Sequence, residues 1–404
     1  MSLKVGILTY HHSYNCGANL QSLATQSMLA KRGIQPVIIN YQDPKKVESF
    51  KKIVSEEQAA QHEAFFKEYY QLGPLLTKPE EIEPFCLNEL DGVIVGSDAI
   101  FRLAAKYSPK RIAKRLLRRD QTYTSFSSME QLSPYWLNWE KPTKNTSFGK
   151  ASIAASSRGT PFYFLKPSLM GDVKRAVADF DLVTVRDSWT KKLVRCLSLG
   201  QSPAEICHDP VFGLNANFEL PQDEQNLDLS RTILVSLKAD PSWRKAFVEE
   251  AHRRDYEVKL LPSPEDYFPF PECDGEISLP FSPLEWYRCL SKAAGYVGFR
   301  FHALVSCMCN ETPVVTVDTG QNLFKGPDRR SPCYFTCQEA KILPRYFTKK
   351  KLKASSPTDV IQLLFDENLQ RKANAFSKAS SDQVNCIVDR TIELFKSKSD
   401  SLKN

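Results

Sequence analysis

The feature that most constrains the fold is the alternation of short apolar runs with longer amphipathic stretches along the 404 residues. The short runs are rich in Val, Ile and Leu without strict apolar–polar alternation, as expected of strands buried on both faces of a sheet. Alternation of such strands with helices favours parallel sheets wound from βαβ units. The predicted strands are 5–10, 37–40, 92–96, 182–185, 233–237, 258–261, 295–299 and 313–317, and the predicted helices include 19–32, 167–179, 189–199 and 241–254.

Chain length predicts two such units. A chain of 404 residues exceeds one ordinary core, and a hydrophobic content of 42% supplies material for two. Segment 215–230 lacks an apolar period and is expected to link the halves, with a fresh strand opening at Thr232. We therefore predict an α/β protein with two Rossmann-like parallel-sheet domains, residues 1–220 and 221–370, facing across a cleft, and a C-terminal helix at 371–404.

The first predicted domain carries a strongly basic insertion at about 102–148. Its amphipathic pattern suits a helix at a membrane surface or facing a diphosphate, and it equally suits a solvated basic face. The whole chain has 54 basic and 47 acidic residues, a net charge of +7 that, without a reader motif, argues against a dedicated nucleic-acid binder. The basic residues of the insertion are Arg102, Lys106, Lys110, Arg111, Lys114, Arg115, Arg118 and Arg119.

Cysteine use and hydropathy predict a reduced, cytoplasmic location. The eleven cysteines include no C-x-x-C pair, so we expect free thiols and no metal site. The N-terminus has no secretory pattern, and no stretch approaches 18 uninterrupted apolar residues. The only membrane association considered is therefore peripheral, at the inner face, through the basic insertion.

Ligand sites in such folds lie at the carboxyl ends of the strands, so the residues that follow each predicted strand are the candidates. The first predicted strand is followed by Asn15 and Gly17 and then by a helix. The N-terminus of this helix could bind an anion, and the alternative interpretation is an ordinary βα turn. Ser97 and Asp98 follow the third strand, where an Asp more often caps the next helix.

Arginine and histidine follow later strands. The guanidinium of Arg186 can bind a carboxylate or a phosphate through two hydrogen bonds. The alternative is that Arg186 forms a salt bridge at the start of the next helix. Arg300 and His302 combine anion neutralisation with proton transfer at a strand end, which favours a functional site over a core histidine. Ser156 and Arg158 lie at another strand end, Lys325 with Arg329 and Arg330 follows the last predicted strand, and Asp209 before Pro210 is expected to form a turn.

Seven segments, in this order, resemble the polysaccharide pyruvyl transferase family across about residues 1–330. The opening block, residues 14–21, is similar to the family's N-Y-G-A-x-L-Q motif, and residues 39–41 to its I-N-Y. Gly96-Ser97-Asp98, Ala154-Ala155-Ser156, Val185-Arg186-Asp187-Ser188, Asp209-Pro210-Val211 and Arg300-Phe301-His302-Ala303 are similar to G-S-D, A-A-S, V-R-E-x-S, D-P-V/T and R-L-H-A.

The resemblance implies a GT-B-like fold, with the C-terminal helix crossing back to the first domain. It also implies transfer of the enolpyruvyl group of phosphoenolpyruvate to sugar hydroxyls of a polysaccharide or its lipid-diphosphate-linked precursor, giving a pyruvate ketal and phosphate. On this interpretation Arg186 and Arg300 hold the donor's anions, His302 is the general acid or an anion ligand, and Asp98 is the base. No cofactor or metal is implied. Asn15, Gly17, Ser97, Ser156, Arg158 and Lys325 are the further candidates for substrate binding.

The sequence differs from the family's motifs at several positions, and these differences leave the identity of the acceptor open. After G-S-D the chain has Ala99 to Arg102 in place of Gln-Trp, Cys16 replaces an aromatic residue, and A-A-S continues into Ser157 and Arg158. A nucleotide-sugar glycosyltransferase, with Glu285 and Trp286 in the nucleotide site, remains an alternative, as does a catalytically inactive glycan-binding relative. A dehydrogenase is disfavoured because no G-x-G-x-x-G follows a strand.

Overall fold

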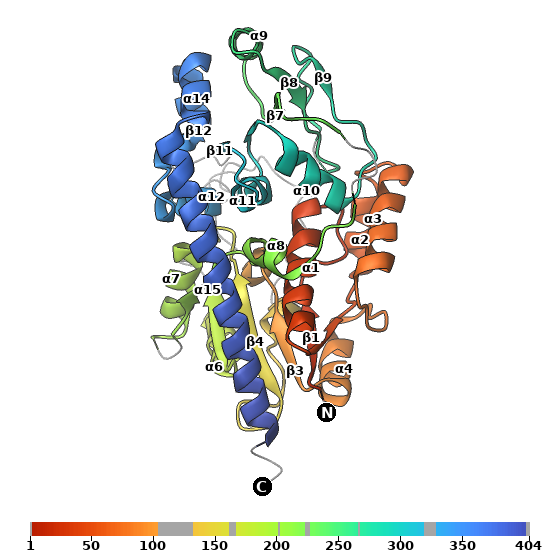
Figure 1. Ribbon diagram of the computed structural model, residues 1–404. Coiled ribbons are helices and arrows are strands. Elements are labelled where there is room, and N and C mark those ends of the chain that lie inside the picture. Colours follow the sequence, from red (N-terminus) through yellow and green to blue (C-terminus); the bar gives the residue numbers. More distant parts are fainter. Residues whose placement is uncertain are drawn as a thin grey trace, which may run out of the picture.

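The computed structural model describes residues 2–103, 132–160, 167–200, 203–222, 227–265, 267–318 and 329–400. It contains two six-stranded sheets, each formed by its own part of the chain, with every strand pair parallel. The first sheet lies in the lower part of Figure 1 and the second in the upper part. This confirms the predicted α/β fold with two parallel-sheet domains.

The first sheet has the order β2-β1-β3-β4-β5-β6. Its strands are β1 (Lys4–Leu8), β2 (Gln35–Ile38), β3 (Gly92–Val95), β4 (Gly149–Ala155), β5 (Leu182–Val185) and β6 (Glu205–Ile206). Every residue of β3, β4 and β5 is buried, which explains why these runs are apolar without alternation.

The second sheet has the order β12-β11-β10-β7-β8-β9. Its strands are β7 (Thr232–Ser236), β8 (Glu257–Leu260), β9 (Gly275–Glu276), β10 (Gly295–Gly298), β11 (Val314–Asp318) and β12 (Tyr346–Thr348). The predicted strands did not include β6, β9 and β12, because edge strands of two or three residues carry too few positions to show a pattern. They also did not include β4, of which only the end before Ser156 was expected.

Helices cover both sheets (Figure 1). Those that follow the first strands are α1 (Cys16–Lys31), α2 (Pro44–Lys51), α3 (Glu56–Tyr69), α4 (Ile82–Glu89), α6 (Pro167–Ala178), α7 (Ser188–Leu197) and α8 (Leu214–Asn217). The later ones are α9 (Pro241–His252), α10 (Pro283–Lys292), α11 (Phe301–Cys309), α12 (Pro332–Glu339), α13 (Lys349–Ala354), α14 (Pro357–Leu364) and α15 (Glu367–Asp400). Short 3-10 helices are η1 (Pro79–Glu81), η2 (Ala99–Phe101), η4 (Pro134–Trp136), η5 (Pro210–Gly213) and η6 (Leu343–Arg345).

The long helix α15, blue in Figure 1, runs from the second domain back along the first, as the family resemblance implied. Phe395 packs over the first sheet so closely that a Cβ on Gly149 would lie 2.1 Å from its ring. Lys398 near the end of the helix is 2.9 Å from the carboxylate of Asp181, which precedes β5. The crossing helix therefore attaches the end of the chain to the first domain, although it begins at Glu367 rather than at 371.

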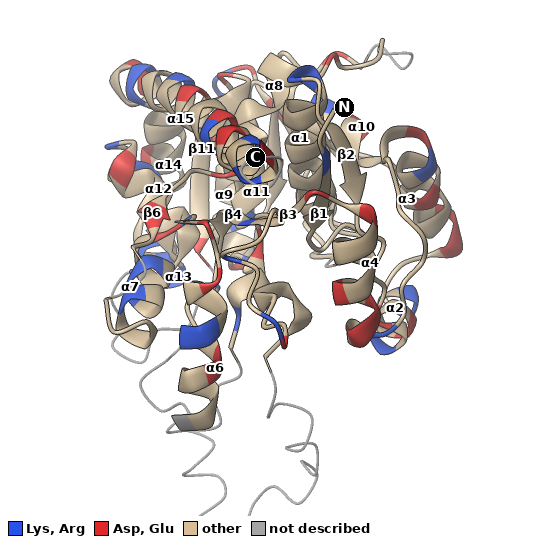
Figure 2. Ribbon diagram, turned by 90° about the horizontal axis from the view of Figure 1, so that it is seen from below, with Lys and Arg blue, Asp and Glu red and all other residues tan. Residues whose placement is uncertain are grey.

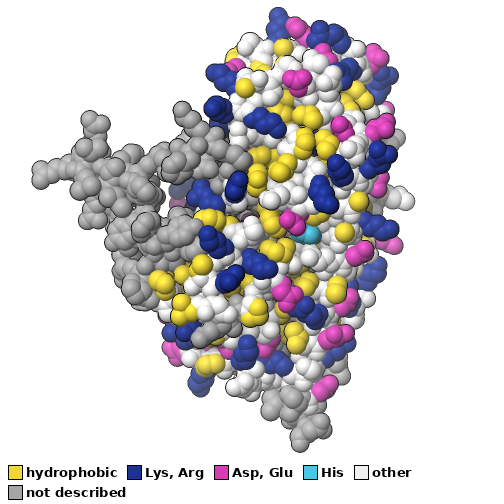
Figure 3. Space-filling view, turned by 90° about the vertical axis from the view of Figure 1, so that its left-hand side faces the viewer, with side chains coloured by type: hydrophobic (Ala, Val, Ile, Leu, Met, Phe, Trp, Pro, Cys, Tyr) yellow, Lys and Arg dark blue, Asp and Glu magenta, His cyan; other side chains and the backbone are white. Residues whose placement is uncertain are grey.

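Charges on the surface are mixed. Basic and acidic residues are interspersed along α15 in Figure 2. On the face shown in Figure 3, hydrophobic side chains form small groups between Lys, Arg, Asp and Glu side chains. Within the described ranges, no helix is long and apolar enough to cross a membrane. Most of the basic insertion falls outside the described residues. Of the eight basic residues named for it, only Arg102 is described.

Candidate functional site

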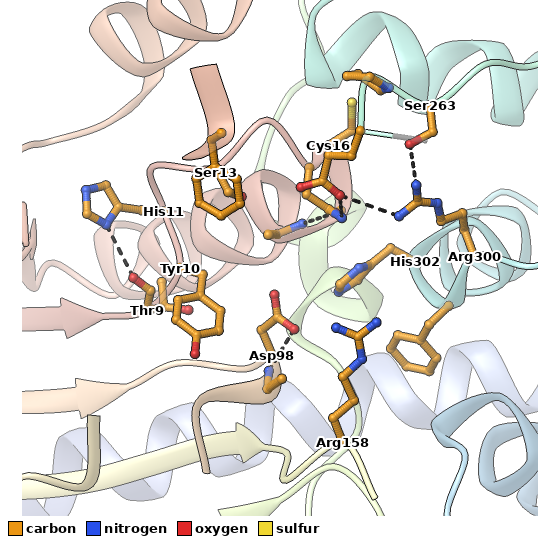
Figure 4. Close-up of a pocket in the computed structure, with 18 of the residues that line it drawn as sticks. Thr9, Tyr10, His11, Ser13, Cys16, Asp98, Arg158, Ser263, Arg300 and His302 are labelled. Carbon is orange, nitrogen blue, oxygen red and sulfur yellow. Dashed lines mark hydrogen bonds and ion pairs between the residues drawn. The ribbon is translucent and has the colours of Figure 1, made fainter. Parts of the chain in front are cut away.

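The carboxyl ends of both sheets face a common cavity of about 670 Å³. From the first domain it is lined by residues that follow β1, β3, β4 and β5. From the second it is lined by Ser236, the last residue of β7, and by residues that follow β8, β10 and β11. Figure 4 shows Tyr10, Asp98 and Arg158 on one side, Arg300 and Ser263 on another, and His302 between them. The two sheets thus supply one shared site, as expected for facing parallel-sheet domains.

The loop after β1 brings the N-terminus of α1 to the cavity. Asn15 caps this helix, since its Oδ1 accepts a hydrogen bond of 3.1 Å from the N–H of Ala18. Gly17, in the first turn, lies against the ring of His302 from the second domain. A Cβ on Gly17 would be 2.2 Å from His302 Cγ, so only glycine permits this contact.

His302 lies in the first turn of α11, above a buried cluster of polar groups. Its Nε2 is 3.6 Å from Asp209 Oδ2, an ion-pair distance slightly longer than a hydrogen bond. The same carboxylate oxygen accepts a hydrogen bond of 2.8 Å from Arg186 Nη1. The cluster thus links the histidine of one domain to a carboxylate and an arginine of the other.

Ser97 and Phe301 complete this cluster. Ser97 Oγ donates to Asp209 Oδ2 at 2.8 Å and accepts from Arg186 Nη1 at 3.2 Å. The guanidinium of Arg186 lies 4.4 Å from the centroid of the Phe301 ring. These contacts fix Arg186, which is only 6% exposed, at the floor of the cavity.

Asp209 is held ionised. Burial alone raises the pKa of its carboxyl, but the neighbouring His302 and the Arg186 guanidinium outweigh burial and hold that pKa well below its usual range. The imidazole of His302 thus lies between this carboxylate and the cavity.

His11, which also lines the cavity, has a different environment. It is buried, with Nε2 3.1 Å from Asn40 Oδ1. Burial lowers the pKa of His11 to about 4, so its ring is neutral near pH 7. Of these two histidines, His302 is the better candidate for a proton donor.

A second cluster crosses the cavity near Arg300. Arg300 Nη2 donates to Ser263 Oγ at 2.6 Å, and Arg300 Nη1 is 3.6 Å from Glu265 Oε2. The same Glu265 oxygen accepts from Asn15 Nδ2 of the first domain at 2.9 Å. A carboxylate of the chain itself thus lies where a bound anion would contact Arg300.

Asp98 and Arg158 occupy strained backbone positions at the first-domain edge. Their φ angles are 82° and 48°, in the region that favours glycine. The Asp98 side chain accepts a hydrogen bond of 2.7 Å from the N–H of Ala99 and so caps η2, as the simpler interpretation predicted. It nevertheless faces the cavity between Tyr10 and Arg158 (Figure 4).

The cavity brings together most of the residues that the sequence singled out. Seven of them line it, namely Asn15, Gly17, Asp98, Arg158, Arg186, Arg300 and His302. Ser97 and Ser156 are fully buried behind its wall, where Ser156 Oγ donates to Asp187 Oδ2 at 2.7 Å. Lys325 lies outside the described residues.

Asp187 accepts a hydrogen bond from the N–H of Thr190 and caps α7. Arg186 therefore pairs with Asp209 rather than with its sequence neighbour.

Asp209, Glu265 and Tyr10 were missed as site residues. Asp209 does form the expected turn, since its Oδ1 accepts from the N–H of Val211 at 3.1 Å. Its D-P-V context was a signal, but the pairing with Arg186 and His302 depends on how two distant segments pack. Glu265 follows β8 and gives no local signal. Of the two residues assigned to a nucleotide site, Trp286 lines the cavity, whereas Glu285 accepts from the N–H of Ser282 in a capping box.

In the part of the chain that the structure describes, no three His, Cys, Asp or Glu side chains lie close enough together to bind a metal ion. All eleven cysteines are free thiols. Burial raises the pKa of the Cys16 thiol, so this residue beside Gly17 is a small apolar group rather than a nucleophile.

The close approach of Gly17 and His302 gives a first prediction. Gly17→Ala is expected to displace the imidazole and to lower activity by on the order of ten-fold, because small displacements of a reacting group are costly. Gly171→Ala is the matched control, since a Cβ there meets nothing within 4 Å. Steady-state kinetics of both variants, with circular dichroism to verify folding, measure the effect. Equal activity of the two variants would contradict the assigned position of His302.

Solved structures with the same architecture include three with TM-scores of 0.50 to 0.53. A protein from Listeria monocytogenes described as a UDP-N-acetylglucosamine 2-epimerase has a TM-score of 0.53 at 12% identity, covering 99% of this chain and 98% of its own. UDP-GlcNAc 2-epimerase from Neisseria meningitidis bound to UDP-GlcNAc has a TM-score of 0.52 at 10% identity, covering 96% and 99%. Arabidopsis thaliana UGT89C1 has a TM-score of 0.50 at 7% identity, covering 97% and 100%. At these identities the likeness concerns the fold alone.

Two facing parallel-sheet domains, a cationic cavity between them and a returning C-terminal helix define a GT-B-like protein. The sequence model of polysaccharide pyruvyl transferases matches residues 15–321. The chain therefore belongs to the polysaccharide pyruvyl transferase family. No curated protein sequence matches it.

Proposed function

We propose that the chain transfers the enolpyruvyl group of phosphoenolpyruvate to two hydroxyls of a sugar, forming a pyruvate ketal and releasing phosphate. The observation that carries this proposal is the convergence of Arg158, Arg186, Arg300 and His302 on one cavity from two domains. Phosphoenolpyruvate carries a carboxylate and a phosphate, so its binding calls for several cations and oriented N–H donors.

The donor's two anionic groups match two distinct cationic positions. Arg300 already holds a carboxylate of the chain, Glu265, at 3.6 Å, which supports its use as an anion ligand. Arg186 lines the floor of the cavity, where its fixed guanidinium faces the second anion. The N-terminus of α11, which begins at Phe301, adds peptide N–H groups between them.

Proton transfer is assigned to His302 and Asp98. His302 gives a proton to the methylene carbon of the enol, which becomes a methyl group, and C2 becomes an oxocarbenium-like centre. A sugar hydroxyl attacks C2 and gives its proton to Asp98. Cleavage of the C2–O bond then releases phosphate, which takes the proton from Asp98, and the second hydroxyl adds to C2 and gives its proton back to His302. Asp209, whose Oδ2 is 3.6 Å from His302 Nε2, orients the imidazole for this transfer.

The test of this function titrates the purified 404-residue chain with phosphoenolpyruvate and, in separate experiments, with a panel of nucleotide sugars. Binding of phosphoenolpyruvate is measured by calorimetry, and phosphate release is followed by ³¹P NMR with methyl hexosides that have free 4- and 6-hydroxyls. Binding with acceptor-dependent phosphate release supports the proposal. Binding of nucleotide sugars instead points to a glycosyltransferase, and binding of neither points to an inactive glycan-binding relative.

A further inference from the structure

The cavity has a second lobe, on the first domain, that the donor chemistry does not use. It lies between the loop after β1 and helix α2, and Tyr10, Tyr135, Lys46, Phe50 and Arg102 line it. In Figure 4 the ring of Tyr10 lies beside Asp98, on the side away from Arg300. Asp98, the proposed base, therefore lies between this lobe and the donor cations.

Aromatic rings form one wall of the lobe. The centroids of Tyr10 and Tyr135 are 4.9 Å apart in an edge-to-face arrangement, and Tyr41 lies 6.3 Å from Tyr135. Tyr41 and Tyr135 are buried, so the wall is rigid, whereas Tyr10 is partly exposed to the cavity. Burial and the nearby Asp98 raise the pKa of Tyr10 to about 12, so its hydroxyl keeps its proton. A rigid aromatic face with a hydroxyl donor suits the C–H face and hydroxyls of a sugar ring.

Cations surround this wall. Lys46 Nζ is 5.2 Å from the Tyr10 centroid and 5.9 Å from that of Tyr135, and Arg102 and Arg158 line the same region. Two carboxylates, those of Asp43 and Asp98, line the same region, and each also accepts a hydrogen bond from a backbone N–H, of Lys45 and of Ala99 respectively. Three cations against these two carboxylates leave an excess of positive charge around the aromatic wall, which favours a ligand with negative charge.

We propose that this lobe binds the acceptor as a sugar ring that carries an anionic substituent, either a phosphate or a carboxylate. This proposal rests on the proposed function, since it assigns the acceptor class to the same cavity. The ring stacks on Tyr10, its anion contacts Lys46 and Arg102, and its reacting hydroxyls face Asp98.

The test measures binding of sugars without phosphoenolpyruvate, so its result is separable from that of the phosphate-release experiment. Glucose 1-phosphate, glucuronic acid and neutral methyl glucoside are titrated against the full-length protein and observed by ligand NMR. Both anionic sugars or one of them should bind more tightly than methyl glucoside, and their relative affinities distinguish phosphate from carboxylate. Equal affinity for the neutral sugar would overturn the assignment.

Four variants locate the binding. Tyr10→Ala and Lys46→Glu are expected to weaken binding of the anionic sugar by about ten-fold or more, which corresponds to about 1.4 kcal/mol. Lys45→Glu is the matched control, because Lys45 is the adjacent residue of α2 and does not line the cavity. Lys46 is exposed, so Lys46→Glu remains informative if Tyr10→Ala fails to fold. Loss of binding in Arg300→Ala but not in Lys46→Glu would place the sugar at the donor cations and overturn the proposal.

Discussion

Arg300→Ala is expected to lower pyruvyl transfer by roughly 10²- to 10³-fold, the usual cost of removing a group that stabilises developing charge. Arg300 is held by Ser263 at 2.6 Å, with its guanidinium in the cavity between the two domains. The donor loses a phosphate dianion in the reaction, so a fixed cation at this position acts on both binding and leaving-group departure. Calorimetry with phosphoenolpyruvate and steady-state phosphate release measure the two contributions separately.

Two further variants sharpen this test. Arg231→Ala is the matched control, because Arg231 is exposed, pairs with Asp255 and does not line the cavity. Glu265→Gln is expected to tighten binding of phosphoenolpyruvate several-fold, since it removes the carboxylate that competes for Arg300. If Arg300→Ala and Arg231→Ala bind phosphoenolpyruvate equally well, Arg300 has no part in donor binding.

The parallel sheets and the position of the cavity were predictable from the sequence. Buried strands such as β3 and β5 appear as continuous apolar runs, and in parallel sheets all polar residues that follow such strands must lie at one edge. Hence Asp98, Arg186, Arg300 and His302 could be placed in one site without knowledge of any contact. The helices α2, α3 and α4 were not predicted, because segment 44–89 is rich in charged residues and α2 buries none of its side chains.

The pairings within the site were not predictable. For a salt bridge at the helix start, Asp187 or a neighbouring residue would be the partner of Arg186. Instead, Asp187 caps α7, and Arg186 pairs with Asp209, 23 positions away. Glu265 and Asn15 are 250 positions apart and meet only because the two domains face each other. Local rules describe capping and turns well, but they cannot specify which carboxylate a buried guanidinium selects when several lie at the same sheet edge.

Asp209→Asn is expected to impair both folding stability and catalysis. Asp209 accepts hydrogen bonds from Arg186 and Ser97 and lies 3.6 Å from His302, all in a buried environment. The amide keeps the shape but not the charge, so the buried guanidinium of Arg186 loses its counterion. Breaking a buried ion pair from one side costs about 3–5 kcal/mol of the free energy of unfolding. Asp389→Asn, at a half-exposed pair with Arg32, should cost about 1 kcal/mol or less.

The pH dependence distinguishes this ion pair from a mere packing defect. Because the folded-state pKa of Asp209 lies well below its usual value of about 4, its stabilising contribution is present above pH 4 and is lost as the pH falls further. The difference in the free energy of unfolding between wild type and Asp209→Asn should therefore stay constant from pH 7 to pH 5 and shrink below pH 4. Urea denaturation at pH 7, 5 and 3.5 measures it. A difference that persists unchanged at pH 3.5 would mean that packing, not charge, sets the cost.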